Sequence, residues 1–306
     1  MKQTHVDVPT SFTQPTGHVD LNNDGIGYIE SYDFSTANLS AETRIAAIST
    51  IASVCYQSPK ALGSISLYDR LAAESAGLPS SSFEFVPVWI SPDRLEQIEN
   101  TSSTDDIERM SILKYGELVT IDSGEVGLLT NLRALIADVG DKADDFFNTP
   151  EECAIIAKHF KVYKAKIDLA TRAQYIRHRV SWQELSRRYV SGKKSPFEFY
   201  LDPVLRDLEY TAKGTDMEDE IRCHYDQQTL IDLSIASYNQ AISQGVKPEK
   251  ARRLLHQSMY TTVWSAWQPS PLKSFYDLRL DKHAQSEIRE LAVGMQSLQT
   301  KAAMSV

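Results

Sequence analysis

Arginine side chains gather in one short stretch of the sequence, residues 171–190, where they could grip an anion. The stretch reads TRAQYIRHRVSWQELSRRYV and holds one acid, Glu184, and one histidine, His178. Its arginines are Arg172, Arg177, Arg179, Arg187 and Arg188. A guanidinium keeps its charge when partly buried, and its fork of N–H donors matches carboxylate and phosphate groups. The stretch therefore indicates either a cleft for a planar or phosphate-like anion or a basic amphipathic helix paired with acidic neighbours.

The composition of the chain narrows the classes of function. With 306 residues, 42% hydrophobic and 24% charged, the chain is long enough to bury a sizeable core as one elaborated domain or two. Its formal net charge of -9 argues against direct binding of nucleic acid, because an acidic surface repels a phosphate backbone. A small anionic ligand remains compatible with that charge, since a local arginine cluster is enough to hold it.

Cysteine usage and hydropathy point to a cytoplasmic protein. The three cysteines, Cys55, Cys153 and Cys223, show no paired spacing, so we expect neither a disulfide framework nor a metal site. Cys55 lies in an apolar segment, which favours an inert buried thiol over a reactive one. The first twenty residues lack the apolar core of a signal peptide, and no run approaches the roughly 20 apolar residues of a membrane span.

Residues 20–30, DLNNDGIGYIE, resemble the first half of a calcium-binding loop. Acidic and amide side chains alternate from Asp20 to Asp24, and Gly25 follows at the place of a tight turn. The position that should hold a bidentate Glu is Ser31, and no helical pattern precedes the loop. We therefore expect a turn that leads into a strand over residues 27–34.

The remaining pattern predicts an α+β fold, with a modest mixed or antiparallel sheet flanked by long helices. The expected helices cover residues 40–56, 66–76, 126–139, 219–244, 245–255 and 283–304, and the other expected strands cover residues 82–90 and 160–170. Residues 1–19 are expected to form a flexible lead-in, residues 20–298 one domain, and residues 299–306 a tail. The acidic, irregular segment 91–159 is expected to be an insertion into that domain.

Three segments carry a resemblance to a known family. The first is Arg177-His178-Arg179, followed by Ser181, Gln183-Glu184, Ser186 and Arg188-Tyr189. The others are GVKPEKARRLLHQSMYT at 245–261 and FYDLRLDKHAQSEIRELA at 275–292, with a weaker echo in SSSFEFVPV at 80–88. In this order they resemble the flavin-dependent thymidylate synthases, which methylate the uracil ring of deoxyuridine monophosphate. The chain departs from the signature in two places: one residue is missing before Ser181, and Gln183 stands where Asn is usual.

The resemblance implies roles for individual residues. Nucleotide binding falls to Gln174, Glu184, Ser186, Arg188, Arg252 and Arg279. Cofactor binding falls to Ser81, Arg177, His178, Arg179, Gln183 and His283. The residues expected to take part in the chemistry are Arg279, Arg177 and His178, with Arg279 against the carbonyl edge of the uracil. The alternative for Arg279 is an ion pair with Asp281 or Glu287 at the end of a helix.

By the same resemblance, the chain is expected to be an FAD-dependent pyrimidine nucleotide C5 methyltransferase. It would use NADPH and 5,10-methylene-tetrahydrofolate, act on dUMP, and assemble as a homotetramer whose sites are shared between subunits. Several positions on the flavin side depart from the family pattern: Ser53, Cys55, Phe85, Gln268 and Ser270. Three alternatives therefore stay open, namely a relative acting on UMP or dCMP, a nucleotide hydroxymethylase, and a catalytically silent nucleotide-binding homologue.

Overall fold

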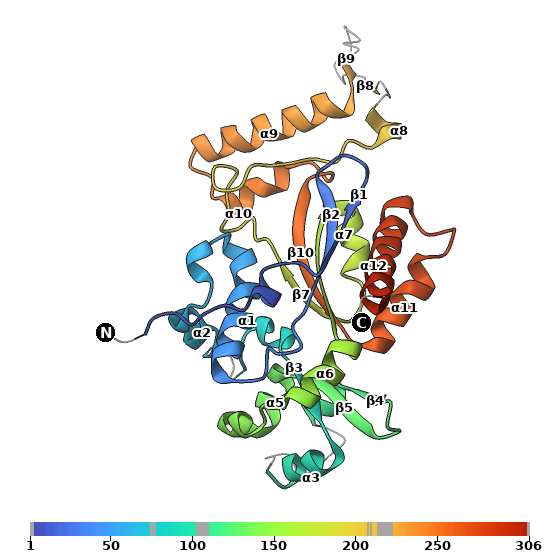
Figure 1. Cartoon of the computed structure of the whole chain (residues 1–306). Helices are drawn as coiled ribbons and strands as arrows, with labels where there is room; N and C mark the ends of the chain where they lie inside the picture. The colour runs from blue at the N-terminus through green and yellow to red at the C-terminus, as the bar shows by residue number, and fades with distance from the viewer. Residues whose placement is uncertain are drawn as a thin grey trace.

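A five-stranded antiparallel sheet forms the centre of the molecule (Figure 1). The computed structural model describes residues 3–73, 78–101, 110–206, 208, 210–212 and 223–304. The strand order in the sheet is β1-β2-β6-β10-β7. The strands are β1 (Gly17–Leu21), β2 (Gly27–Tyr32), β6 (Lys161–Asp168), β7 (Ser181–Glu184) and β10 (Tyr260–Trp267). The longest pairing joins β6 to β10 over their whole length, from Tyr260 opposite Asp168 to Trp267 opposite Lys161.

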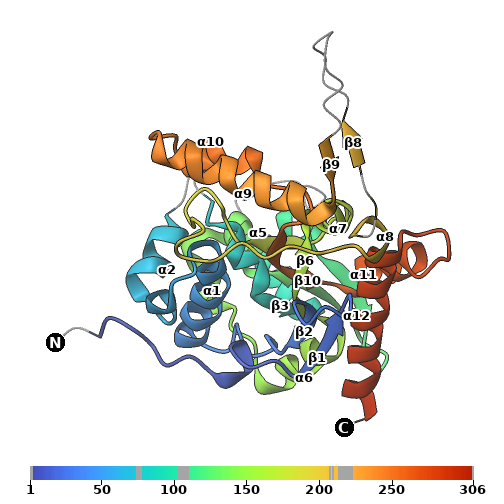
Figure 2. The same cartoon turned by 90° about the horizontal axis from the view of Figure 1, so that it is seen from above.

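Helices pack against both faces of this sheet. On one side lie α7 (Leu169–Tyr175), α11 (Pro269–Arg279) and α12 (Ser286–Met304), and on the other lies α1 (Ala41–Tyr56) (Figures 1 and 2). Because successive strand residues point to opposite faces, β10 contributes Trp264 to the core shared with α1 and Trp267 to the core shared with α12. Each face of the sheet therefore has its own apolar core.

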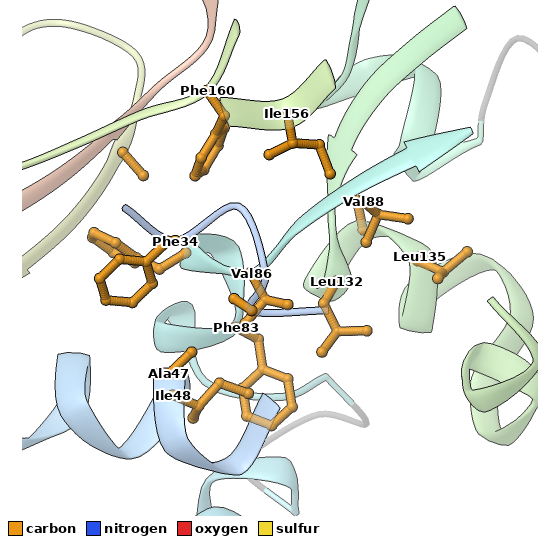
Figure 3. Packing of buried hydrophobic residues seen from close by; sticks show 14 of the residues in the cluster. Phe34, Ala47, Ile48, Phe83, Val86, Val88, Leu132, Leu135, Ile156 and Phe160 are labelled. Carbon is orange, nitrogen blue, oxygen red and sulfur yellow. The ribbon is translucent and has the colours of Figure 1, made fainter. Parts of the chain in front are cut away.

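A second, three-stranded sheet is built mostly from residues 91–159. Its order is β3-β5-β4, with β3 (Pro87–Ile90), β4 (Glu117–Thr120) and β5 (Val126–Asn131). Around it lie α3 (Pro92–Thr101), α4 (Ser111–Lys114), α5 (Leu132–Val139) and α6 (Pro150–His159). Figure 3 shows Ile48 of α1, Val88 of β3, Leu135 of α5 and Ile156 of α6 among the side chains of one continuous core. The segment thus shares its core with α1.

The remaining elements lie in two places. Helix α2 (Ile65–Ala72) packs beside α1, whereas α8 (Pro203–Arg206), the strand pair β8 (Tyr210–Ala212) and β9 (Cys223–Tyr225), α9 (Gln227–Ser243) and α10 (Pro248–Ala251) lie toward one end of the central sheet (Figure 1). Short 3-10 helices lie at Thr10–Phe12, Pro59–Ala61, Ser81–Phe85, Gly140–Asp145 and Arg252–Leu254. In both views α9 crosses the end of the sheet beside α10 (Figures 1 and 2).

The structure confirms the α+β class and most of the expected elements. Ser40 caps α1, although its partner in the capping box is Thr43 rather than an acidic residue. Pro248 occupies the first turn of α10, and β6 and α12 lie where the pattern predicted them. Helix α2 ends at Ala72, and residues 74–76 of the expected helix lie outside the described residues. The helix expected over residues 219–244 is wrong at its start, because Cys223–Tyr225 form strand β9 and α9 begins only at Gln227; residues 219–222 lie outside the described residues.

Three further expectations need correction. The apolar run 126–139 is a strand followed by a helix, because the side chain of Asn131 accepts a hydrogen bond from Ala134 N–H and starts α5 there. Residues 81–85 form a 3-10 helix, and the strand begins only at Pro87. The lead-in is anchored, since Phe12 is fully buried and β1 begins at Gly17. The division into one domain with an insertion stays a prediction.

The segment that resembles a calcium loop is a hairpin turn between β1 and β2. Both oxygens of Asp24 are used inside the protein: Oδ1 accepts the N–H groups of Ile26 and Gly27, and Oδ2 accepts the hydroxyl of Tyr260 at 2.5 Å. Within the described residues there is no group of three or more potential metal ligands. No helix in the described part of the chain is both long and apolar enough to cross a membrane.

One buried arginine ties α1 to the segment 91–159 and gives a test of the fold. Arg44 is 2% exposed and donates to Asn38 Oδ1, Ala143 O and Asp144 Oδ1. Replacing it in Arg44→Met leaves Asn38 Oδ1 buried without a donor, removes one of the two donors to Ala143 O, and breaks the ion pair with Asp144. We therefore expect a loss of about 2–4 kcal/mol in the free energy of unfolding. Chemical denaturation measures this loss.

The matched control is Lys158→Ala, which removes an ion pair with Asp122 in which both side chains are mostly exposed. Exposed pairs contribute little, so its denaturation midpoint should equal that of the wild type. Equal midpoints for the Arg44 and Lys158 variants would contradict the role given to Arg44.

Candidate functional site

The arginine-rich stretch folds as a short helix, a turn and an edge strand. Asp168 caps α7 by accepting the N–H groups of Ala170 and Thr171. The helix ends at Tyr175, whose ring is fully buried, and the chain then turns through Arg177-His178-Arg179 into β7. The basic amphipathic helix considered from the sequence is therefore wrong. The turn presents Arg177 and Arg179 to solvent and holds His178 half-buried between them.

Three of the residues implied by the resemblance meet at this turn. Arg279, at the end of α11, donates from Nε to Nε2 of His178 at 3.2 Å. Its NH2 group reaches the backbone carbonyl of Gln174 at 3.5 Å. None of the ion pairs among the described residues joins Arg279 to Asp281 or Glu287, so the helix-end ion pair is not what holds its side chain. The contact brings together residues more than 100 positions apart in the chain.

His178 is held as a neutral ring. It packs edge-on against Phe275, with ring centroids 5.0 Å apart, and lies 6.1 Å from the ring of Trp267. Burial and the positive charge of Arg279 lower its pKa from the ordinary value of 6.5. Because a guanidinium only donates, Nε2 must accept, which leaves the proton of the neutral imidazole on Nδ1. The imidazole N–H at Nδ1 is then the donor that His178 offers to a ligand.

Two glutamines close one side of this cluster. Nε2 of Gln174 donates to Oε1 of Gln285 at 2.5 Å. Gln285 was not among the predicted site residues, although it belongs to the Ala-Gln pair in the segment 275–292. Its contact with Gln174 places the turn before α12 beside the end of α7. The segment that contains Gln285 was therefore recognised in the sequence, but its contact with Gln174 was not predicted.

A second group of predicted residues joins β7 to the 3-10 helix before β3. Gln183 donates from Nε2 to Ser81 Oγ at 2.6 Å, and its Oε1 lies 3.1 Å from Cys55 Sγ, which acts as donor. Cys55 and Ser81 stand where the family pattern has flavin-side residues. The fold thus brings Gln183 and Ser81, two predicted cofactor residues, into direct contact, and Cys55 also contacts Gln183.

Glu184 is held by residues from two other elements. Its Oε2 accepts Nε of Arg172 at 3.0 Å and also forms an ion pair with the NH2 group of the same arginine. Its Oε1 accepts the hydroxyl of Thr261 at 3.0 Å. Arg172 was noted in the sequence only as part of the basic cluster. Its role in the fold is to hold the carboxylate that the resemblance assigns to the nucleotide.

Four predicted residues are not joined to these clusters. Among the described residues, no hydrogen bond, ion pair or ring contact links the side chains of Ser186, Arg188, Arg252 and His283 to another predicted site residue. Arg188 lies over the ring of Tyr189 at 5.2 Å, and Arg252 is exposed in the 3-10 helix after α10. The backbone N–H of exposed His283 donates to Asp281. Within one chain, the site is assembled only in part.

The segment 91–159 forms hydrogen bonds with the side chains at two of the positions that depart from the family pattern, Gln268 and Ser270. Nε2 of Gln268 donates to the carbonyls of Tyr115 and Leu129, each at 3.0 Å. Ser270 donates its backbone N–H and its hydroxyl to the carboxylate of Glu117. Side chains that would otherwise be free for a ligand are therefore used to dock β4 and β5 against the start of α11.

The Arg279 contact makes a prediction for the titration of His178. Removing the cation in Arg279→Gln should raise the pKa of His178, because a nearby positive charge no longer opposes protonation. In the wild type the lowered pKa means that the unfolded chain binds this proton more readily. His178 therefore costs stability as the pH falls through 6.5, and it costs none well above that value.

Nitrogen-15 NMR of the imidazoles measures both the pKa and the tautomer of His178. His18 is the internal control, because its pKa is raised by its own hydrogen bond with Asp20 and should not respond to the substitution. An unchanged His178 titration in the variant, or a neutral ring protonated on Nε2, would contradict the geometry described.

Comparison with known proteins agrees with the motifs. The family model described as thymidylate synthase complementing protein matches residues 156–303. Proteins named flavin-dependent thymidylate synthase are similar to the chain. The one from Thermosipho africanus is 32% identical over 157 residues, 49% of this chain and 65% of the relative. The one from Thermotoga neapolitana is 30% identical over 134 residues, 44% and 58%. The one from Aquifex aeolicus is 29% identical over 187 residues, 60% and 52%.

The aligned part of the chain spans between about half and two thirds of the length of these relatives. The residues matched by the family model contain the turn with His178, strand β10, the helix that ends with Arg279, and all but the last residue of α12. Residues 156–303 match the family of thymidylate synthase complementing proteins, and the chain is similar to the flavin-dependent thymidylate synthases that its motifs resemble.

Proposed function

We propose that this protein transfers a one-carbon unit from 5,10-methylene-tetrahydrofolate to C5 of a uracil nucleotide, converting dUMP to dTMP. The observation that carries the proposal is the contact of Arg279 with His178 and with the carbonyl of Gln174. It sets a guanidinium at the junction between predicted nucleotide residues and predicted cofactor residues. The aligned relatives bear the name of this activity.

Arg279 has a specific task in such a reaction. Carbon C5 of a uracil becomes nucleophilic when electron density from the ring accumulates, and that charge falls partly on a ring carbonyl oxygen. A fixed guanidinium donor beside the oxygen stabilises the charge more than water does, because it needs no reorganisation. Neutral His178 accepts from Arg279 and so fixes the direction of the guanidinium. We also assign Arg177, an exposed cation in the same turn as His178, to binding of the cofactors.

We assign the phosphate of the nucleotide to Ser186, Arg188 and Arg252. A hydroxyl with two guanidiniums is a suitable donor set for a phosphate dianion. Arg188 and Arg252 are both exposed, and within one chain no contact joins them. A homotetramer in which one subunit supplies Arg188 and its neighbour supplies Arg252 would complete the set, and we propose that assembly. Glu184, held by Arg172 and Thr261, would meet the sugar hydroxyl.

The flavin side offers a donor set that fits FAD. Arg177 and Arg179 are exposed and, among the described residues, have no carboxylate partner, so both are available to a pyrophosphate. Ser81 and Gln183, which are hydrogen-bonded to each other, would add neutral polar groups. Bound FAD would pass reducing equivalents from NADPH to the transferred carbon. Exposed His283 would contribute a further contact, whereas Gln268 and Ser270 are already engaged by the segment 91–159.

The hydrogen bonds of Gln268 and Ser270 to the segment 91–159 favour a second group of candidate functions. With these two flavin-side positions tied to β4 and β5, the cofactor pose, and with it the nucleotide or the product, would differ from the family pattern. A relative acting on UMP or dCMP, or one forming a hydroxymethyl product, keeps all the nucleotide-side residues. A catalytically silent nucleotide-binding homologue keeps them as well. Mass analysis of the product formed from dUMP, UMP and dCMP separates these candidates.

The decisive experiment combines flavin spectra with turnover. The purified protein should bind FAD, its visible absorbance should bleach with NADPH, and dUMP labelled with tritium at C5 should release the label when methylene-tetrahydrofolate is present. Nucleotide binding without tritium release would favour the silent homologue. Absence of FAD binding under all conditions would overturn the proposal.

The phosphate assignment gives a paired prediction. Arg188→Ala and Arg252→Ala should each raise KM for dUMP about tenfold to a hundredfold, because a charge-assisted hydrogen bond to the phosphate is worth about 1.5–3 kcal/mol. The effect on kcat should be smaller. Steady-state kinetics at saturating cofactors measure both constants.

The control for these variants is Arg253→Ala, which removes the exposed neighbour of Arg252 from the same 3-10 helix. Its KM should stay at the wild-type value. If Arg253→Ala raised KM as much as Arg252→Ala, the effect would come from general charge and not from a bound phosphate.

A further inference from the structure

A cavity of about 530 Å³ lies on the face of the central sheet that α1 covers. Its floor comes from Lys164 and Lys166 on β6 and from Thr262 and Trp264 on β10. These residues alternate with Tyr163 and Trp267, which belong to the opposite core beneath His178. None of the residues implied to bind nucleotide or flavin lines the cavity, although Ser53, a flavin-side position that departs from the family pattern, does. Its volume is within the range of small-molecule sites, about 300–1,000 Å³.

Arg187 brings an unbalanced charge to this cavity. The residue is 8% exposed and lines the cavity wall. Its NH1 and NH2 groups donate to the carbonyls of Ser195 and Pro196, at 2.7 and 3.3 Å. Its Nε–H is buried without a hydrogen-bond partner. No ion pair in the described residues involves Arg187, although its guanidinium lies over the ring of Phe197 at 4.8 Å and Glu198 is part of the same lining. A guanidinium keeps its charge at neutral pH, so Arg187 carries a positive charge without a carboxylate of its own.

The other two cations of the cavity are already balanced. Lys164 pairs with Glu30 at 3.0 Å, and Lys166 pairs with Glu198 at 2.7 Å. The site therefore has room for one anionic charge, and Arg187 is the cation among these three that has no ion-pair partner. A buried donor without an acceptor costs free energy, which an oxyanion at this position would recover.

Part of the cavity wall is aromatic and apolar. The rings of Tyr32 and Trp264 pack at 4.5 Å between centroids, and Leu185 and Val54 lie in the same lining. A free inorganic ion would leave this surface uncovered, since the cavity holds much more than a phosphate. A flat ring beside the oxyanion would cover it.

We propose that this cavity is a second ligand site, separate from the proposed nucleotide and flavin site, for a small organic anion. The ligand carries one oxyanion, a carboxylate or a phosphate, on a flat ring. The oxyanion meets Arg187, and the ring lies against Tyr32 and Trp264.

Calorimetric titration of the full chain with phenyl phosphate and with benzoate tests the proposal. At least one of them should bind saturably with one site per chain. The ligand that binds more tightly shows whether the site prefers a phosphate or a carboxylate. Absence of saturable binding by both up to about 10 mM, which corresponds to roughly 2.7 kcal/mol, would overturn the proposal. Inorganic phosphate should bind at least tenfold more weakly than phenyl phosphate, and equal affinity would refute the role of the aromatic wall.

Two variants locate the binding. Arg187→Met removes the unpaired donor and should weaken binding at least tenfold. Because Arg187 is buried and this variant can fail to fold, Thr262→Leu serves beside it: the larger side chain fills the cavity floor without touching an ion pair. It should weaken binding to the same degree. Wild-type affinity in both variants would overturn the proposal.

Arg279→Gln is the control that separates this site from the proposed function. It alters the turn on the other side of the sheet and should leave the affinity for phenyl phosphate unchanged. Loss of binding in Arg279→Gln, with binding retained in Thr262→Leu, would place the ligand in the proposed nucleotide site and refute a second one. If the wild-type protein showed no one-carbon transfer, the binding of phenyl phosphate in this cavity would still be expected.

Discussion

The pairing of β6 with β10 is the constraint on which the rest of the structure depends. Eight residues of each strand face one another in a fixed antiparallel register, and a shift by one residue would turn every side chain to the other face. The register sets Lys164 and Trp264 toward α1, and Tyr163 and Trp267 toward α12. Two cores, and two different environments for ligands, follow from this single alternation.

The proposed active site depends on what directly follows each of these strands. After β6 the chain turns into α7 and reaches His178, and after β10 it turns into α11 and reaches Arg279. Trp267 and Phe275 fill the space beneath the imidazole, so the same segment provides both the apolar support and the cation. Because burial and the cation act together, His178 is neutral where an exposed histidine would be partly charged.

The motifs in the sequence predicted which residues would meet at this turn, but not the elements that bring them together. Arg279 and Gln174 were assigned to one site from the resemblance, and the structure joins them. Strand β10 was not predicted, although its run of β-branched and aromatic residues is typical of a buried strand. The run 126–139 was read as one helix because short apolar segments do not reveal their period, and Asn131 divides it. The nucleotide roles of Ser186, Arg188 and Arg252 stay predictions, because no contact among the described residues joins their side chains to the rest of the site.

The central claim is that Arg279 meets the base and Arg188 meets the phosphate of a uracil nucleotide. A crystal structure of the protein with FAD and dUMP tests it most directly. The account predicts a uracil carbonyl oxygen within hydrogen-bond distance of Arg279, next to the flavin ring, with the phosphate on Arg188 of one subunit and Arg252 of another. A nucleotide bound elsewhere, or bound with Arg279 still directed only at His178 and Gln174, would contradict it.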